Sequence, residues 1–172
     1  RIDYDYLAIG FRNGVVLDWD CVIQGHDISE CVSGVNEDRV IFNAIPWSLD
    51  VDLLKAVEDS VKNGKKLTEL LKELAPNTYS AFSVWVGEDR ALLLLEVIGY
   101  TMIPKYVMHK AVMLVGEGKN GKSTYLRLIQ SVLGSSNVAH VSLQDLIDSE
   151  FMRYQLYRKL ANVFADIPKR AL

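Results

Sequence analysis

The sequence predicts an α/β fold in which a short parallel strand, a glycine-rich loop and a helix follow one another in the second half of the chain. Residues 111–115 form a continuous apolar run of the kind found in buried parallel strands. Residues 116–123 carry the pattern G-x-x-x-x-G-K-S, and apolar residues then recur at helical spacing from Leu126 to Leu133, where Gly134 ends the pattern. A phosphate-binding loop requires this order of elements.

The loop itself predicts a binding site for ATP with Mg²⁺. Its residues are Gly116, Glu117, Gly118, Lys119, Asn120, Gly121, Lys122 and Ser123, followed by Thr124. Glycine at the two fixed positions lets the backbone curl so that its N–H groups face phosphate oxygens at a helix N-terminus. We expect Lys122 to contact the β- and γ-phosphates, Ser123 to coordinate Mg²⁺, and Thr124 to support the first helical turn.

A second element of the same site is predicted at residues 160–166, a mainly apolar strand that ends in Asp166. This is the form of a Walker B strand, whose carboxylate lies beside the phosphate loop and holds Mg²⁺, usually through water. Because Ile167 follows, Asp166 is the single acid there. The sequence leaves open whether it holds the metal, polarises the attacking water, or does both.

The first hundred residues divide into a strand-rich part and a helical part. Residues 4–23 contain two apolar runs on either side of Asn13-Gly14, a dipeptide favoured in hairpin turns, and residues 40–45 form another strand candidate. Apolar residues at helical spacing then predict helices at 50–62, 67–74, 79–86 and 89–98. We interpret their aromatic and leucine stripes as core packing rather than a base-stacking platform.

Three units follow from this pattern. They are a small β-rich module at 1–49, a helical region at 50–104 and a P-loop ATPase core at 105–172. Within the last unit, residues 138–141 are a further strand candidate, and 143–147 and 151–157 are short helix candidates. Because the chain starts at Arg1 and ends soon after the predicted Walker B strand, we expect it to be an excerpt of a longer protein.

Composition favours an ordinary globular chain, and the phosphate loop favours a cytoplasmic location, where nucleoside triphosphates and reducing conditions coexist. The 172 residues are 49% hydrophobic and 24% charged, and no apolar stretch approaches the length needed to span a bilayer. Cys21 and Cys31 lack the histidines that a zinc site needs, although His26 lies between them. We expect two reduced thiols, with a disulfide as the alternative.

The net charge of −3 is unevenly distributed. Residues 1–50 hold nine acids against three Lys or Arg, whereas residues 101–172 hold five acids against ten. The basic half therefore carries the phosphate loop, which suits a triphosphate and also nucleic acid, although a solvated surface explains a bias of this size equally well.

The chain resembles the phage and plasmid primase-helicase family, whose motor belongs to the superfamily three helicases of the AAA+ class. The segments that carry the resemblance are residues 11–15, 94–100, 113–124, 142–146, Phe151 and 159–167. The resemblance implies an AAA+-like partial parallel sheet and a hexameric, ATP-driven DNA helicase from a virus, plasmid or integrated element, often fused to a primase. DNA would be gripped largely by parts outside this excerpt.

The resemblance also implies that a sensor residue and an arginine finger from a neighbouring subunit complete the catalytic site around Lys122 and Asp166. Both would come after Leu172, so the excerpt alone is not expected to form a complete hydrolytic site. Two alternatives remain open from the residues: a P-loop phosphotransferase, and a nucleotide-dependent assembly module without helicase activity.

Overall fold

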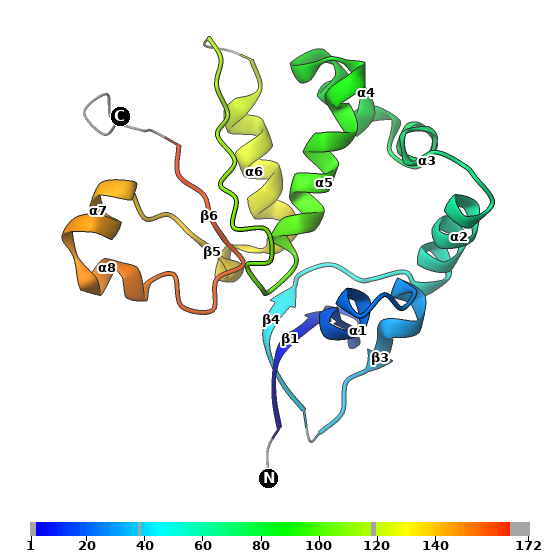
Figure 1. Cartoon of the computed structure of the whole chain (residues 1–172), viewed down its shortest axis with the longest axis horizontal. Coiled ribbons are helices and arrows are strands. Elements are labelled where there is room, and N and C mark those ends of the chain that lie inside the picture. Colours follow the sequence, from blue (N-terminus) through cyan, green and yellow to red (C-terminus); the bar gives the residue numbers. More distant parts are fainter. Residues whose placement is uncertain (1–2, 38, 118–119, 166–172) are drawn as a thin grey trace.

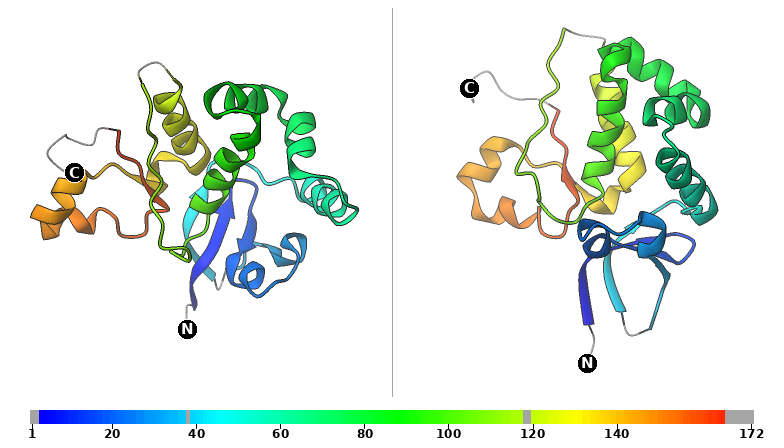
Figure 2. Two further views of the ribbon diagram at one scale, coloured as in Figure 1. Left: turned by 45° about the horizontal axis from the view of Figure 1, so that its top comes forward. Right: turned by 45° about the vertical axis from the view of Figure 1, so that its right-hand side comes forward.

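The protein has a mixed α/β structure, seen here in a computed structural model that describes residues 3–37, 39–117 and 120–165. Its N-terminal quarter forms a four-stranded sheet, its middle forms a set of helices, and a two-stranded sheet lies toward the C-terminal end (Figure 1). In both views of Figure 2, α5 (Ala91–Thr101) and α6 (Lys122–Leu133) stand side by side above the N-terminal sheet.

The N-terminal sheet has the strand order β3-β2-β1-β4, with β1 antiparallel to β2 and parallel to β4. Its strands are β1 (Asp3–Phe11), β2 (Val15–Asp18), β3 (Val32–Gly34) and β4 (Arg39–Ile45). The predicted hairpin is confirmed. Gly14 has φ 76°, which glycine adopts without a Cβ penalty, and its N–H donates to the carbonyl of Phe11 at 2.9 Å.

The expectation of reduced thiols is wrong, because the structure joins Cys21 to Cys31 in a disulfide. Cys21 lies in α1 (Trp19–Ile23) and Cys31 ends η1 (Ile28–Cys31), and the two Cα atoms are 5.6 Å apart, within the normal range for a bridge. The turn at Gly25 folds η1 back onto α1. The cellular compartment alone does not reveal that these two cysteines lie close together in space.

The four predicted helices before the loop are present. They are α2 (Val51–Lys62), α3 (Leu67–Leu74), α4 (Pro76–Val86) and α5, with the short turn η2 (Glu88–Arg90) before the last. Asp50, the first residue of the helix predicted at 50–62, is the N-cap of α2, since its carboxylate accepts the N–H of Leu53 at 3.0 Å. Pro76 begins α4 at a position where its missing N–H is not needed.

After the loop, α6 runs to Leu133 and ends at Gly134 with φ 82°, as the sequence predicts. The remaining elements are η3 (Ser135–Asn137), β5 (Val138–Ala139), α7 (Leu143–Asp148), α8 (Glu150–Tyr154) and β6 (Ala161–Asn162). The strand predicted at 160–166 is thus present in part: two residues pair in parallel with β5, and Asp166 lies outside the described residues.

The buried strand predicted at residues 111–115 is absent, and this prediction was wrong. The segment is extended but makes no ladder, and Val112, Met113 and Val115 are 57%, 58% and 84% exposed. Figures 1 and 2 show it passing beside β6, yet β6 pairs with β5 instead. A strand needs a partner for its N–H and C=O groups, and an apolar run does not specify one.

One hydrophobic core connects the three predicted segments. It contains Ile9, Phe11, Leu17, Cys31, Ile45, Phe82, Ala91, Leu94, Ile98, Tyr125, Ile129, Leu133 and Val138. At its centre, Phe82 of α4 meets Tyr125 of α6 edge to face, with ring centroids 5.8 Å apart. The core thereby fixes α6 against α4, α5 and the sheet.

Two buried amides join the N-terminal sheet to the loop after α6. The Nδ2 of Asn43 on β4 donates to the Oδ1 of Asn137 at 3.0 Å, and the Nδ2 of Asn137 donates to the carbonyls of Ala44 and Leu133 at 2.8 and 2.7 Å. Asn43 and Asn137 are 6% and 3% exposed. Because buried polar groups are costly when unpaired, this network specifies how β4 sits against α6.

No helix in the described residues is long and apolar enough to cross a bilayer.

We expect Asn137→Ala to lower the free energy of unfolding by about 2 to 4 kcal/mol, because it leaves the buried carbonyl of Leu133 and one N–H of the Asn43 amide without a hydrogen bond. Urea unfolding followed by circular dichroism measures this. Asn63→Ala, at the exposed end of α2, is the matched control and should change the free energy by less than about 0.5 kcal/mol. Equal effects of the two substitutions would contradict the structural role of the amide pair.

Candidate functional site

The glycine-rich loop ends at the N-terminus of α6. Gly121 has φ 84° and is the N-cap, and its carbonyl accepts the N–H of Tyr125 at 2.9 Å. The N-cap Gly121 has no side chain to accept from the first turn of α6, and α3, α4 and α5 likewise lack a side-chain cap. As in any α-helix, the first N–H groups of α6 have no intrahelical acceptor, so the positive end of the helix can receive an anion.

Lys122, the first residue of α6, folds its side chain back over the loop. Its ammonium group donates to the carbonyls of Gly116 and Glu117 at 2.7 and 2.8 Å and to the Oδ1 of Asn120 at 2.6 Å. These three acceptors match the three N–H donors of an ammonium group. The loop thus holds the Lys122 ammonium group against its own oxygen atoms. A bound phosphate would compete with these oxygens for the three N–H donors of the ammonium group.

Both fixed glycines stand where a side chain would collide with a neighbour. A Cβ on Gly116 would overlap the side-chain amide of Asn120, and a Cβ on Gly121 would lie 2.6 Å from Cδ2 of Trp85. The indole of Trp85, from α4, therefore rests directly on the loop backbone. Glycine permits this close approach as well as the left-handed backbone at Gly121.

A pocket of about 460 Å³ opens beside the loop. Its walls come from α4 (Trp85, Val86), from α5 and the turn before it, and from residues 112–115, and its floor reaches Gly121, Lys122 and Tyr125. The lining is mostly apolar, and Arg90 and Lys122 supply the charged groups. This combination suits a ligand with an apolar or aromatic body and an anionic end.

Tyr125 fixes the loop end of α6 to α5. Its side chain is 2% exposed, and its hydroxyl donates to the carbonyl of Leu94 at 2.7 Å. Burial raises the pKa of Tyr125 to about 12, so the hydroxyl stays protonated and keeps this hydrogen bond over the physiological pH range.

The structure brings together part of the predicted site. The contacts described above hold five of its residues close together: Gly116, Glu117, Asn120, Gly121 and Lys122. Ser123 and Thr124 are exposed residues in the first turn of α6.

Three predicted residues, Gly118, Lys119 and Asp166, lie outside the described residues. Within the described ranges, no group of three His, Cys, Asp or Glu side chains is arranged to hold a metal ion.

Sequence reasoning missed Trp85 and Arg90. Trp85 belongs to an apolar stripe that we assigned to core packing, and the sequence separates it from Gly121 by the whole of α5 and the extended segment. No local pattern marks either residue as part of a site, because their position depends on how α4 packs against α6.

Gly121→Ala should destabilise the fold by about 2 to 4 kcal/mol, since it combines a left-handed backbone with a collision against Trp85. Gly64→Ala is the matched control: Gly64 has φ 90°, but a Cβ there would meet no atom within 4 Å. We expect the control to cost only about 1 kcal/mol. Urea unfolding followed by tryptophan fluorescence measures both, and equal losses would show that Trp85 does not rest on the loop.

One family model, described as a family of unknown function (DUF5906), matches residues 114–171. No curated protein matches the chain. No solved structure matches it either. The family match covers less than half of the 172 residues, and it coincides with the part of the chain that runs from Leu114 through the glycine-rich loop and α6 to Asp166.

Proposed function

We propose that this chain binds ATP with Mg²⁺ through residues 116–124 and forms the nucleotide-binding portion of an ATP-hydrolysing DNA helicase motor. The observation that carries the proposal is the complete G-x-x-x-x-G-K-S motif at the uncapped N-terminus of α6, with the Lys122 ammonium group already held at the loop. The AAA+ class and the helicase activity rest on the family resemblance described above.

The loop residues fit a polyphosphate. The first-turn N–H groups of α6 lack internal acceptors, and the two fixed glycines allow the backbone to approach a ligand closely. Lys122 would exchange its loop acceptors for phosphate oxygens and neutralise the charge that develops on them. The exposed Ser123 hydroxyl would bind Mg²⁺, with Asp166 as the second group that positions the metal.

The apolar pocket beside the loop suits the rest of the nucleotide. Trp85 presents an aromatic ring next to Gly121, and Leu94 and Val97 line the same cavity. An aromatic and aliphatic lining removes a nucleobase from water without demanding a particular hydrogen-bonding pattern.

Hydrolysis requires water to attack the γ-phosphate in line with the leaving group, and the bound Mg²⁺ would supply charge stabilisation. Lys122 would stabilise the same charge from the protein. In this proposal Asp166 orients the attacking water or holds the metal, and an arginine from a neighbouring subunit of a homo-hexamer completes the site. ATP hydrolysis stimulated by single-stranded DNA in the intact protein would favour the motor.

Two other outcomes would favour the alternative functions. Nucleotide binding with oligomerisation and no hydrolysis would favour an assembly module. Transfer of phosphate to a small acceptor would favour a phosphotransferase.

Lys122→Ala should weaken the binding of ATP with Mg²⁺ by roughly tenfold to a hundredfold, because it removes a charged donor from the phosphates. Isothermal titration calorimetry on this chain measures the effect. Lys55→Ala removes an exposed lysine from α2 and should leave the affinity unchanged. Absence of ATP and ADP binding by the folded wild-type chain would refute the proposal, and unaltered binding by Lys122→Ala would refute the role of the lysine.

Asp166→Asn should reduce the contribution of Mg²⁺ to ATP affinity by about tenfold, since an amide replaces a carboxylate that orients the hydrated metal. The comparison is the ratio of dissociation constants with Mg²⁺ and with EDTA. Asp148→Asn, an exposed acid at the end of α7, serves as the control. An unchanged ratio in Asp166→Asn would count against the Walker B assignment.

A further inference from the structure

The chain contains three Asn-Gly pairs, and one of them lies in the glycine-rich loop. The pairs are Asn13-Gly14, Asn63-Gly64 and Asn120-Gly121. An Asn-Gly pair is chemically labile, because the main-chain nitrogen of the glycine can attack the side-chain amide of the asparagine and no side chain on the glycine hinders the approach. The surroundings of the nitrogen and of the amide therefore decide which pair reacts.

The attacking nitrogen is engaged in two of the three pairs. The N–H of Gly14 donates to the carbonyl of Phe11 at 2.9 Å, and the N–H of Gly64 donates to the carbonyl of Val61 at 2.9 Å. The N–H of Gly121 has no acceptor within the described residues. Because a nitrogen must give up its proton to attack, one held in a hydrogen bond reacts more slowly. Gly121 thus has the nitrogen that is free to react.

The side-chain carbonyl of Asn120 is polarised by a cation. The Lys122 ammonium group donates to the Oδ1 of Asn120 at 2.6 Å in a partly buried position. Attack on the amide carbon develops negative charge on this oxygen, and a cation in contact with it stabilises that charge. In Asn13, by contrast, the amide is fastened to the main chain of Leu49 through both Nδ2 and Oδ1, at 2.9 and 3.2 Å.

From these contacts we infer that Asn120-Gly121 is a self-modification site, at which the nitrogen of Gly121 displaces ammonia from Asn120 while Lys122 stabilises the developing charge on Oδ1. A bond forms between the Gly121 nitrogen and the Asn120 Cγ, and the bond from Cγ to Nδ2 breaks. The proton lost by Gly121 leaves with Nδ2 as ammonia. Water then opens the resulting succinimide ring at either carbonyl, which yields aspartate or isoaspartate at position 120.

Either product changes the loop. Lys122 then faces a carboxylate in place of a neutral amide oxygen, and isoaspartate also adds a methylene group to the main chain before Gly121. The new negative charge lies where a phosphate would approach, so the modified loop should bind anions more weakly. This consequence rests on the proposed nucleotide-binding function, whereas the modification itself does not.

The chain provides a matched comparison for this site. The tetrapeptide K-N-G-K occurs twice, at residues 62–65 and 119–122, so the local sequence is the same in both copies. The contacts differ, because the Lys65 ammonium group bonds Glu73 at 2.6 Å, whereas that of Lys122 bonds the asparagine of its own tetrapeptide. The first copy is therefore an internal control for the second.

The test is peptide mapping by mass spectrometry after incubation of the whole chain, without nucleotide, in mildly alkaline buffer. We expect Asn120 to convert at least about fivefold faster than Asn63 in the folded chain, since only the former has a free nitrogen and a polarised carbonyl. In urea the two copies should convert at equal rates. Conversion of Asn120 no faster than that of Asn63 would overturn the inference, and so would a difference that persists in urea.

Substitution of the two lysines tests the part played by the ammonium group. Lys122→Ala should slow conversion of Asn120 by about threefold or more, because the charge on Oδ1 loses its partner. Lys65→Ala should leave conversion of Asn63 unchanged, because Lys65 bonds Glu73 instead. Unchanged or faster conversion in Lys122→Ala would refute the role of the ammonium group. Circular dichroism spectra equal to that of the wild type confirm that both variants are folded.

Addition of ATP with Mg²⁺ separates this inference from the proposed function. Bound nucleotide should draw Lys122 from Asn120 to the phosphates, and should therefore slow conversion of Asn120 and not that of Asn63. If calorimetry detects no ATP binding but the two copies still differ without nucleotide, the proposed function fails and the self-modification stands. If ATP binds and the two copies convert equally, the self-modification fails alone.

Discussion

The position of the N-terminus of α6 depends on the packing of Tyr125 against α4 and α5. Its ring meets Phe82 edge to face, and its hydroxyl reaches the carbonyl of Leu94, so a single side chain ties three helices together within one turn of the loop. The buried hydroxyl keeps its proton because burial raises its pKa. Because Tyr125 lies in the first turn of α6, its packing also sets the positions of Gly121 and of Lys122, which begin the helix.

The parts of the structure that follow from local chemistry could be predicted. Asp50 caps α2, Gly134 ends α6, and Asn13-Gly14 turns the first hairpin, because each depends on the backbone preference or hydrogen bonding of residues close in sequence. The start of α6 belongs to the same group, since the spacing of the glycine-rich pattern places Gly121 as the N-cap and Lys122 as the first residue of a helix.

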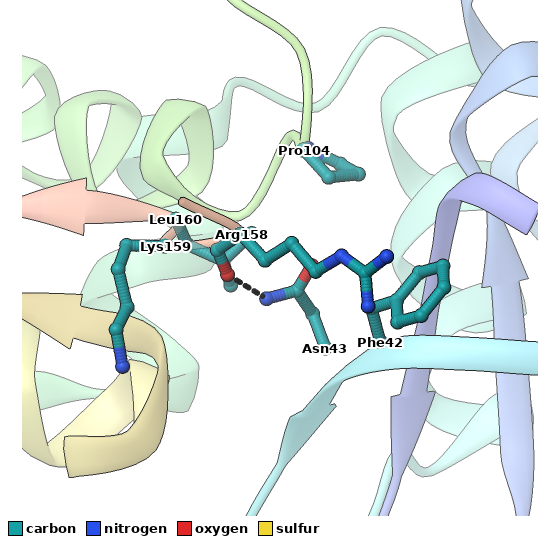
Figure 3. A pocket seen from close by; sticks show the side chains of 6 residues that line it. All are labelled: Phe42, Asn43, Pro104, Arg158, Lys159 and Leu160. Carbon is teal, nitrogen blue, oxygen red and sulfur yellow. Dashed lines mark hydrogen bonds between the residues drawn. The ribbon is translucent and has the colours of Figure 1, made fainter. Parts of the chain in front are cut away.

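Features that depend on distant residues could not be predicted. The Cys21–Cys31 bridge requires the turn at Gly25 to return η1 to α1, and the contact of Trp85 with Gly121 requires α4 to lie on α6. The apolar run before the loop has the composition of a strand but lacks the neighbour that would make it one. Phe42 and Arg158 are in contact (Figure 3) although they are far apart in the sequence, and the residues around each of them do not predict this contact.

The extended segment before the loop has a practical consequence for the behaviour of the chain in solution. Val112, Met113 and Val115 turn apolar atoms outward on a stretch whose main-chain groups, at 111–115, are unbonded within the described ranges. Unbonded main-chain groups of this kind can pair with an extended segment of another polypeptide, as the edge strand of a sheet does. We therefore expect self-association of the purified chain to increase with concentration, through the same residues 112–115 that border the pocket beside the loop.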